Sequence, residues 1–308
     1  NTEVMPGKSV SVEQEVLFVE VDGLYIKSQE KKKQGQEVKI ASVHQGWKKN
    51  GKRTKLIGKH HYIHEEKVPF WEGFELFLMD TYEYDPTRHH LVINGDGAPW
   101  ITACRDYFGP HATFVIDRFH VAREVQSIFR EHPRYRKICK RLAAYDAQGF
   151  LVELNSAVGT TGDEKKEEAL EKLIAQLTQY PEALEDYRER LQEKGMNTEG
   201  FRPMGSAEGT MSVFAKRLKH GRSWSDKGRD KFIDVFVALK DKLEMRTLHG
   251  KLKQALVHEE HPRDANPPKH FVEKLKDSAA EATRNNMAYL QQAIGKPVVG
   301  ALKALKGF

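Results

Sequence analysis

The sequence Leu91-Val92-Ile93-Asn94-Gly95-Asp96-Gly97-Ala98-Pro99-Trp100 decides the expected fold. Its three β-favouring apolar residues predict a short buried strand, and the Gly-Asp-Gly that follows lets the backbone leave that strand sharply. Asp96 is therefore expected at the end of a rigid strand, where a carboxylate stays solvated and is able to bind a cation or activate water. The alternative is a turn residue, because Asp hydrogen-bonds its own backbone in turns.

The amino-acid composition limits the classes of protein to which this chain can belong. Hydrophobic residues make up 39% and charged residues 31% of the 308 positions, which is typical of a globular chain. The 50 Lys and Arg exceed the 44 Asp and Glu, and the net charge of +6 favours polyanionic partners. Two cysteines are too few for a disulfide framework, and no apolar run approaches the ~20 residues of a membrane helix. We therefore expect a cytoplasmic protein, with residues 1–15 as the end of a missing N-terminal region.

Residues 16–26 are almost continuously apolar and predict a central strand that is covered on both faces. Asp22 lies in the second half of this strand and is either a turn residue before Gly23 or a metal ligand, since an unpaired buried carboxylate is costly. Residues 37–47 and 55–63 predict two further antiparallel strands. The turn between them is basic, and it is either a solvated edge or a contact to phosphates.

Downstream, residues 70–84 predict a helix and residues 112–117 predict a strand that ends in Asp117. Residues 118–141 predict a basic helix pair broken at Pro133, and residues 161–195 predict an αα hairpin with two apolar stripes. Further helices are expected from Ser206, over 232–248 and over 271–294. Glu208 is expected at the N-terminal end of the inward face of its helix, as a capping-turn residue or as a functional acid.

Three acids thus stand out, namely Asp22, Asp96 and Glu208. If the first and fourth strands are neighbours, Asp22 and Asp96 lie side by side, and two carboxylates so close repel each other unless a cation lies between them. Three oxygen-donor residues suit Mg²⁺, and two such ions ~3.5–4 Å apart support in-line phosphoryl transfer. The pattern therefore predicts a nuclease or strand-transfer site.

The order of three antiparallel strands, a helix and further strands, with these three acids, resembles the RNase H-like catalytic domain of DDE transposases. More closely, Val21-Asp22-Gly23, the Asn94 to Trp100 segment, Asp117-Arg118-Phe119-His120 and the Glu208 helix resemble the ISLre-type bacterial insertion-sequence transposases, which are related to the Mutator-like group. The similarity covers about residues 16 to 250. It implies an α/β fold with an RNase H-like mixed sheet flanked by helices, and an all-helical insertion before the catalytic Glu helix.

The resemblance also implies a division of the chain and a set of roles. Residues 16–119 and 205–250 would form the two parts of the RNase H-like core, residues 120–204 the helical insertion and residues 251–308 a C-terminal helical segment. Asp22, Asp96 and Glu208 would be the catalytic metal ligands for two Mg²⁺ ions, with Mn²⁺ as a substitute. Asp117 and His120 are possible accessory residues, or else a helix-capping Asp with a packed His.

The partners implied are DNA element ends and target DNA, bound by a homodimer in the bacterial nucleoid, with no membrane. Phosphate contacts are expected from the basic segments, and Trp224 either stacks on an extruded base or belongs to the core. The candidate DNA-binding residues are Arg118, Arg123, Arg130, Lys137, Lys216, Arg217, Arg222 and Trp224. The alternatives are an RNase H-like nuclease that only hydrolyses, a catalytically inactive DNA-binding remnant, and a helical interaction protein that binds its partner through residues 163–194.

Overall fold

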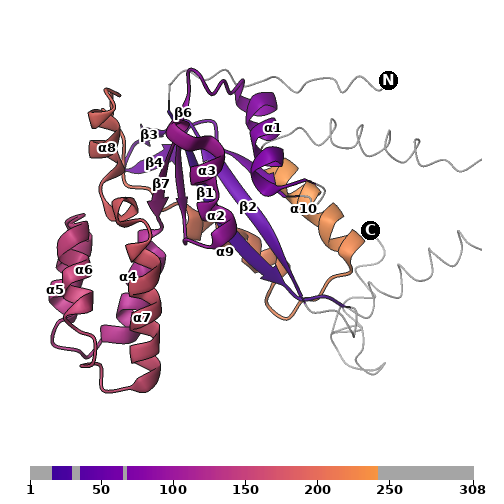
Figure 1. Ribbon diagram of the computed structural model, residues 1–308. Coiled ribbons are helices and arrows are strands. Elements are labelled where there is room, and N and C mark those ends of the chain that lie inside the picture. Colours follow the sequence, from indigo (N-terminus) through magenta and orange to yellow (C-terminus); the bar gives the residue numbers. More distant parts are fainter. Residues whose placement is uncertain (1–15, 30–34, 65–67, 242–308) are drawn as a thin grey trace, which may run out of the picture. The chain divides into compact units, whose positions relative to one another are not determined.

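A computed structural model of the chain describes residues 16–29, 35–64 and 68–241 (Figure 1). The segments 1–15 and 251–308, which the sequence sets apart, lie outside these residues, as does the predicted helix over residues 271–294. Within the described ranges, no helix combines the length and the apolar composition that a bilayer crossing requires.

A five-stranded mixed sheet forms the centre of the described part, in the order β5-β2-β1-β6-β7. β1 (Val16–Ile26) pairs antiparallel with β2 (Gln36–His44), which pairs antiparallel with β5 (His60–Ile63). On its other side, β1 pairs parallel with β6 (His90–Gly95), which pairs parallel with β7 (Ala112–Ile116). The expected α/β class is confirmed, and the first strand and the Asp96 strand are neighbours, which was the condition for bringing Asp22 and Asp96 together.

The chain between β2 and β5 leaves the main sheet as a separate hairpin, β3 (Trp47–Asn50) with β4 (Arg53–Leu56). Gly46 and Gly58 take φ values of 121° and 56° at the two ends of this excursion, a backbone region that favours glycine. The prediction of one strand over 55–63 was wrong because it merged β4 with β5. Gly58, which lies between the two strands, marks the break.

Alternation along β1 decides which helices cover which face of the sheet. Leu17, Val19 and Val21 point into a core shared with α1 (Phe70–Tyr82), α2 (Pro99–Thr102), α3 (Cys104–Phe108), α4 (Arg118–Phe129), α5 (Tyr135–Ala143), α6 (Ala147–Asn155) and α7 (Glu164–Thr178). Leu24 and Ile26 point the other way, against α9 (Ala207–Leu218) and α10 (Asp226–Lys240). The expected coverage of this strand on both faces is confirmed.

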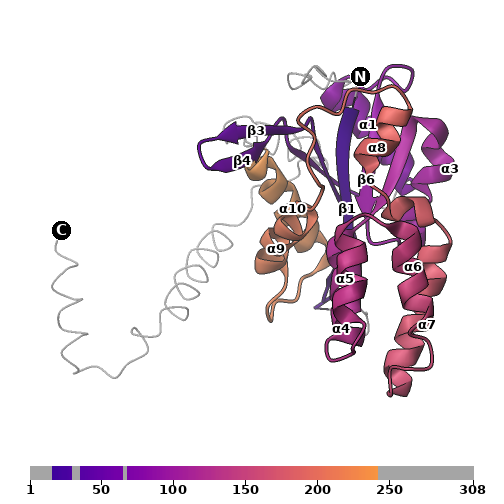
Figure 2. The same cartoon turned by 90° about the vertical axis from the view of Figure 1, so that its left-hand side faces the viewer.

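The helical segment before α9, from α4 to α8 (Tyr187–Glu193), contributes side chains to the cores on both faces of the sheet. Helices α4 to α7 gather beyond one end of the strands (Figure 2), whereas Tyr187 and Leu191 of α8 pack with Val16 and Phe18. The predicted second helix of the αα hairpin begins late, because Pro181 opens only a short 3₁₀ turn, Pro181–Leu184, and Asp186 then caps α8.

β7 is an edge strand of the sheet. Arg190 of α8 donates a hydrogen bond from Nη1 to the main-chain oxygen of Phe114 at 2.9 Å, so one carbonyl group of this edge is already paired with a side chain. Coverage of this kind is one way in which proteins block strand addition at an open edge.

Candidate functional site

Three aspartates lie at one level of neighbouring strands: Asp96 and Asp117 directly follow β6 and β7, and Asp22 lies within β1. Glu20 of β1 is in register with Asn94 of β6, which is in register with Val115 of β7. Two residues further along each chain come Asp22, Asp96 and Asp117. The parallel part of the sheet therefore brings together the two predicted catalytic aspartates and the possible accessory aspartate.

Hydrogen bonds to the backbone orient the first two carboxylates. Asp22 Oδ1 accepts the amide of Gly23 at 2.7 Å, and Asp96 Oδ1 accepts the amide of Ala98 at 2.9 Å. Gly97 takes a φ of 87°, which lets the chain turn away directly after Asp96. The Gly-Asp-Gly sequence thus places Asp96 as expected, at a sharp exit from a buried strand.

The electrostatics of Asp22 place it within reach of the other two aspartates. The pKa of Asp22 is raised from 3.8 to about 6, and burial is the largest cause; the Gly23 amide and His120 oppose the rise, whereas the carboxylates of Asp96 and Asp117 add to it. A divalent cation between neighbouring carboxylates offsets their mutual repulsion. Oxygen donors from Asp22 and Asp96 therefore fit Mg²⁺, which accepts one or two carboxylates and keeps several waters.

Asp117 caps α4 and holds His120. Its Oδ1 accepts the amide of Phe119 at 2.9 Å, and its Oδ2 lies 2.8 Å from His120 Nδ1. The hydrogen bond to Asp117 is the largest cause that raises the pKa of His120. The capping alternative therefore describes this pair, although both residues also act electrostatically on Asp22.

Glu208 lies in the first turn of α9 with its side chain exposed. The inward face of this helix begins at Ala207, and not at Glu208 as the sequence predicts; its other buried members are Thr210, Met211, Phe214 and Leu218. Glu208 is not among the groups that shift the pKa of Asp22. Within the described ranges, no three His, Cys, Asp or Glu side chains are grouped as a metal-ligand set.

Glu20 is the residue that the sequence analysis missed. It is 3% exposed and accepts hydrogen bonds from the amides of Gly205 and Ser206 at 3.0 and 2.9 Å and from the Ser206 hydroxyl at 2.6 Å. Ser206 precedes α9 but donates its hydroxyl to Glu20 and makes no side-chain cap of that helix. The signal was available, since Glu20 is an acid in an apolar strand on the same face as Asp22.

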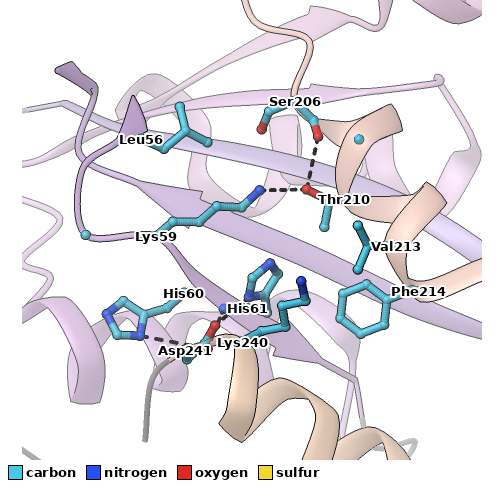
Figure 3. A pocket seen from close by; sticks show the side chains of 12 residues that line it. Leu56, Lys59, His60, His61, Ser206, Thr210, Val213, Phe214, Lys240 and Asp241 are labelled. Carbon is cyan, nitrogen blue, oxygen red and sulfur yellow. Dashed lines mark hydrogen bonds and ion pairs between the residues drawn. The ribbon is translucent and has the colours of Figure 1, made fainter. Parts of the chain in front are cut away.

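A pocket of about 590 Å³ lies beside the first turn of α9 (Figure 3). Lys59 Nζ donates to Thr210 Oγ1 at 2.6 Å across it, and burial lowers the pKa of this lysine. On its other side, His61 Nδ1 lies 2.5 Å from Asp241 Oδ1. None of the three predicted catalytic acids lines this pocket.

Two of the basic residues expected to bind DNA make contacts within the protein. The Arg118 guanidinium lies 3.8 Å from the Tyr145 ring centroid and donates to the Leu142 carbonyl. Lys137 Nζ lies 2.6 Å from Glu153 Oε1. Lys137 is nevertheless exposed, as are Arg123, Arg130, Lys216 and Arg217.

Arg222 and Trp224 help to close the C-terminal end of α9. Arg222 donates to the carbonyls of Lys216 and Lys219 at 3.0 and 3.2 Å. Trp224 Nε1 donates to the Leu218 carbonyl at 3.0 Å, and its ring packs on Phe232 with centroids 5.0 Å apart. The core alternative for Trp224 therefore describes its position.

The fold and these residues define a mixed α/β protein with aspartates gathered at one end of its parallel strands. The chain belongs to UPF0236, an uncharacterised protein family, whose model matches residues 4–254.

Relatives come from two organisms. The UPF0236 protein TTE2489 of Caldanaerobacter subterraneus subsp. tengcongensis is 24% identical over 297 residues, which are 93% of this chain and 62% of the relative. A second UPF0236 protein of that organism, whose name joins eleven locus designations, is 24% identical over 94% of this chain and 60% of its own length. A third, the UPF0236 protein in the vanSb 3′ region of Streptococcus gallolyticus, is 25% identical over 79% of this chain and 53% of its own length. The chain thus spans 53% to 62% of the length of these curated relatives.

Proposed function

We propose that this chain is the catalytic region of a DDE transposase, which cleaves the DNA ends of an insertion sequence and joins them to target DNA. The observation that carries the proposal is the convergence of Asp22, Asp96 and Asp117 at one end of three adjacent strands, with the pKa of Asp22 raised to about 6. The cause, crowded and partly buried carboxylates, is a property of sites that bind divalent cations.

The sheet order supports an RNase H-like assignment. Without the β3–β4 hairpin, the strands lie in the order third, second, first, fourth, fifth, with the last two parallel to the first. Three antiparallel strands, followed by further strands in one mixed sheet, agree with what the resemblance to RNase H-like enzymes implies. In this proposal, α4 to α8 correspond to the helical insertion and α9 to the helix of the catalytic Glu.

Asp22 and Asp96 would hold a metal ion through the carboxylate oxygens that the Gly23 and Ala98 amides do not use. Mg²⁺ bound there would activate the attacking oxygen and stabilise the leaving oxygen of a phosphodiester. Glu20 fixes the start of α9 to β1, two residues from Asp22, and so holds the backbone of Glu208 near this end of the strand. Glu208 itself would complete the ligand set by turning from solvent toward the aspartates.

The names of the relatives support the proposal that proteins of this family are encoded by mobile DNA elements. One UPF0236 protein of Caldanaerobacter subterraneus carries eleven locus designations, and another carries four. One protein encoded at many loci of a genome is what a self-copying or moving DNA element produces.

A second candidate is a catalytically inactive DNA-binding remnant of a transposase. The exposed side chain of Glu208 and the lack of a three-residue ligand group in the described part of the chain favour it. The two candidates differ in whether the aspartates perform metal-dependent chemistry.

The test offers the full chain a duplex with a free 3′-OH end and a supercoiled plasmid, with Mg²⁺ or Mn²⁺. The proposed function requires a joined product that Asp96→Asn abolishes and that Asp106→Asn, an exposed aspartate of α3, leaves intact. Nicks without joining would indicate a hydrolytic nuclease. DNA binding without any metal-dependent product would indicate the remnant.

A further inference from the structure

The β3–β4 hairpin carries a concentration of positive charge. Residues 38–64 contain seven Lys and Arg and no Asp or Glu. Five of these cations belong to the hairpin and its turn, and all five are exposed: Lys48, Lys49, Lys52, Arg53 and Lys55. The hairpin projects from the main sheet in Figure 2. An anionic partner is therefore able to reach these side chains.

The strand register concentrates these cations on one face of the hairpin. Lys48 lies directly opposite Lys55, and Asn50 lies opposite Arg53. Because side chains alternate along a strand, Lys48, Arg53 and Lys55 share a face. Like charges directly opposite each other destabilise a strand pair, and a bound anion reverses that cost. The pairing thus favours a polyanion on this face.

The other face anchors the hairpin to the core. The Trp47 ring lies 4.6 Å from Phe18 and 4.9 Å from His44, measured between centroids. Backbone hydrogen bonds from Gln45 to Ile57 and from Ile57 to Gly46, at 2.9 and 3.0 Å, continue the ladder at its base. The backbone that carries these cations is therefore held in place by the core, which lowers the conformational entropy lost when they bind a partner.

A further contact links the hairpin to the segment that leads into α9. Arg202 Nη1 donates to Thr54 Oγ1 at 2.5 Å, on the face opposite Lys48 and Lys55. Only a few residues separate Arg202 from Ser206, which Glu20 holds. The hairpin, and any partner bound along it, would therefore be linked through Arg202 to the start of the helix that carries Glu208.

We propose that the β3–β4 hairpin is a duplex DNA-binding arm whose Lys48, Arg53 and Lys55 contact backbone phosphates. A two-stranded ribbon fits the major groove, which is about 12 Å wide. Residues 48–55 include no apolar side chain, so the arm has nothing to insert into a lipid surface. The proposal rests on the proposed function only for the identity of the duplex as substrate, since binding by the arm is separate from catalysis.

The test measures the affinity of the full chain for a short labelled duplex by fluorescence anisotropy over a series of KCl concentrations. The triple variant Lys48→Gln, Arg53→Gln, Lys55→Gln should bind more weakly, and the slope of log affinity against log salt should become shallower by about 2 to 3, at ~0.9 for each lost phosphate contact. The matched control removes three exposed cations outside the hairpin and the basic segments, Arg88→Gln, Lys165→Gln and Lys172→Gln, and should keep the original slope.

Equal slopes in the two triple variants would overturn the proposal, because net charge alone would then explain the binding. A charge-preserving Lys48→Arg, Lys55→Arg variant should keep the wild-type slope, which separates loss of charge from damage to the hairpin. If metal-dependent chemistry is absent while the hairpin still determines the slope, the proposed function fails and the DNA-binding arm stands.

Discussion

The carboxylate of Glu20 accepts the hydroxyl of Ser206 at 2.6 Å, across 186 positions of the sequence. This contact, with the amides of Gly205 and Ser206, ties the start of α9 to the middle of β1. A buried carboxylate is stable there because three donors replace its water, and because it lies at the positive end of the helix dipole. The helix that carries Glu208 is therefore fixed at the end nearest Asp22.

Replacing Glu20 with Gln should lower the free energy of unfolding by about 2 to 3 kcal/mol, since the amide loses charge-assisted bonds and turns a donor toward donors. Urea unfolding monitored by circular dichroism measures this change. Glu171→Gln, on the exposed side of α7, is the matched control and should stay within about 0.5 kcal/mol of the parent. An unchanged midpoint for Glu20→Gln would show that the three bonds contribute nothing net.

Ser206→Ala should cost less, about 1 kcal/mol, because the two backbone amides still reach Glu20. In the Glu20→Gln background, Ser206→Ala should cost only a fraction of that amount. A double-mutant cycle on the unfolding free energies measures this coupling. Strictly additive effects would contradict a direct interaction between the two side chains.

Asp22 should make stability fall as pH rises from about 4 to 6. Below its ordinary pKa of 3.8 the carboxyl is protonated in both states, whereas between 3.8 and the folded pKa of about 6 only the folded protein holds the proton. Ionisation in the folded state should cost of the order of 1 to 2 kcal/mol, allowing for partial solvation. Asp22→Asn should remove this slope and be more stable than the parent at pH 8.

A divalent cation should change that pH dependence. Mg²⁺ or Mn²⁺ favours the ionised form of Asp22, so the metal should raise the melting temperature more at pH 8 than at pH 5, and not in Asp96→Asn. Melting curves at the two pH values, with metal and with EDTA, measure this difference. A metal-induced shift that is equal at both pH values would place the cation elsewhere.

His120 should contribute stability mainly in acid. Its bond to Asp117 raises its folded pKa above the usual 6.5, so the contribution is fully present below pH 6.5 and is lost as pH rises through the raised value. His120→Gln should therefore destabilise the protein by about 1 kcal/mol at pH 5.5 and by less at pH 9. His111→Gln, an exposed histidine, is the control; the same loss at both pH values would disprove a charged His120.

Trp224→Phe should separate a core role from base stacking. The variant loses the hydrogen bond to the Leu218 carbonyl and should be about 1 kcal/mol less stable, yet it keeps an aromatic face. Affinity for single-stranded DNA should stay unchanged, because the ring packs on Phe232 inside the protein. A loss of affinity greater than tenfold at unchanged stability would instead support stacking on a base.

The sequence was most informative where local pattern and topology agree. Apolar runs predicted β1, β6 and β7, and the sharp exit at Gly95-Asp96-Gly97 predicted where a carboxylate would lie. The pairing of β1 with β6 was only a condition of the sequence-based prediction, and the structure meets it. Features that are set by the local sequence at the end of one strand could therefore be predicted without the structure.

Features set by distant contacts were not accessible in the same way. Helical spacing places the inward face of α9 only to within one residue, and that residue decides whether Glu208 is exposed. The partner of Glu20 lies in a loop beyond eight α-helices, so nothing local indicates it. The excursion of β3–β4 was hidden because Leu56 and Ile57 continue the apolar pattern across the break before Gly58.

The arginine that closes the outer edge of β7 also restricts how copies of this chain can associate. A second molecule cannot extend the sheet alongside Phe114 without first displacing the guanidinium of Arg190. Synapsis of two DNA ends, if this chain performs it, must therefore join the subunits through helical or loop surfaces, or through the nucleic acid itself, and continuous β-pairing between them is disfavoured.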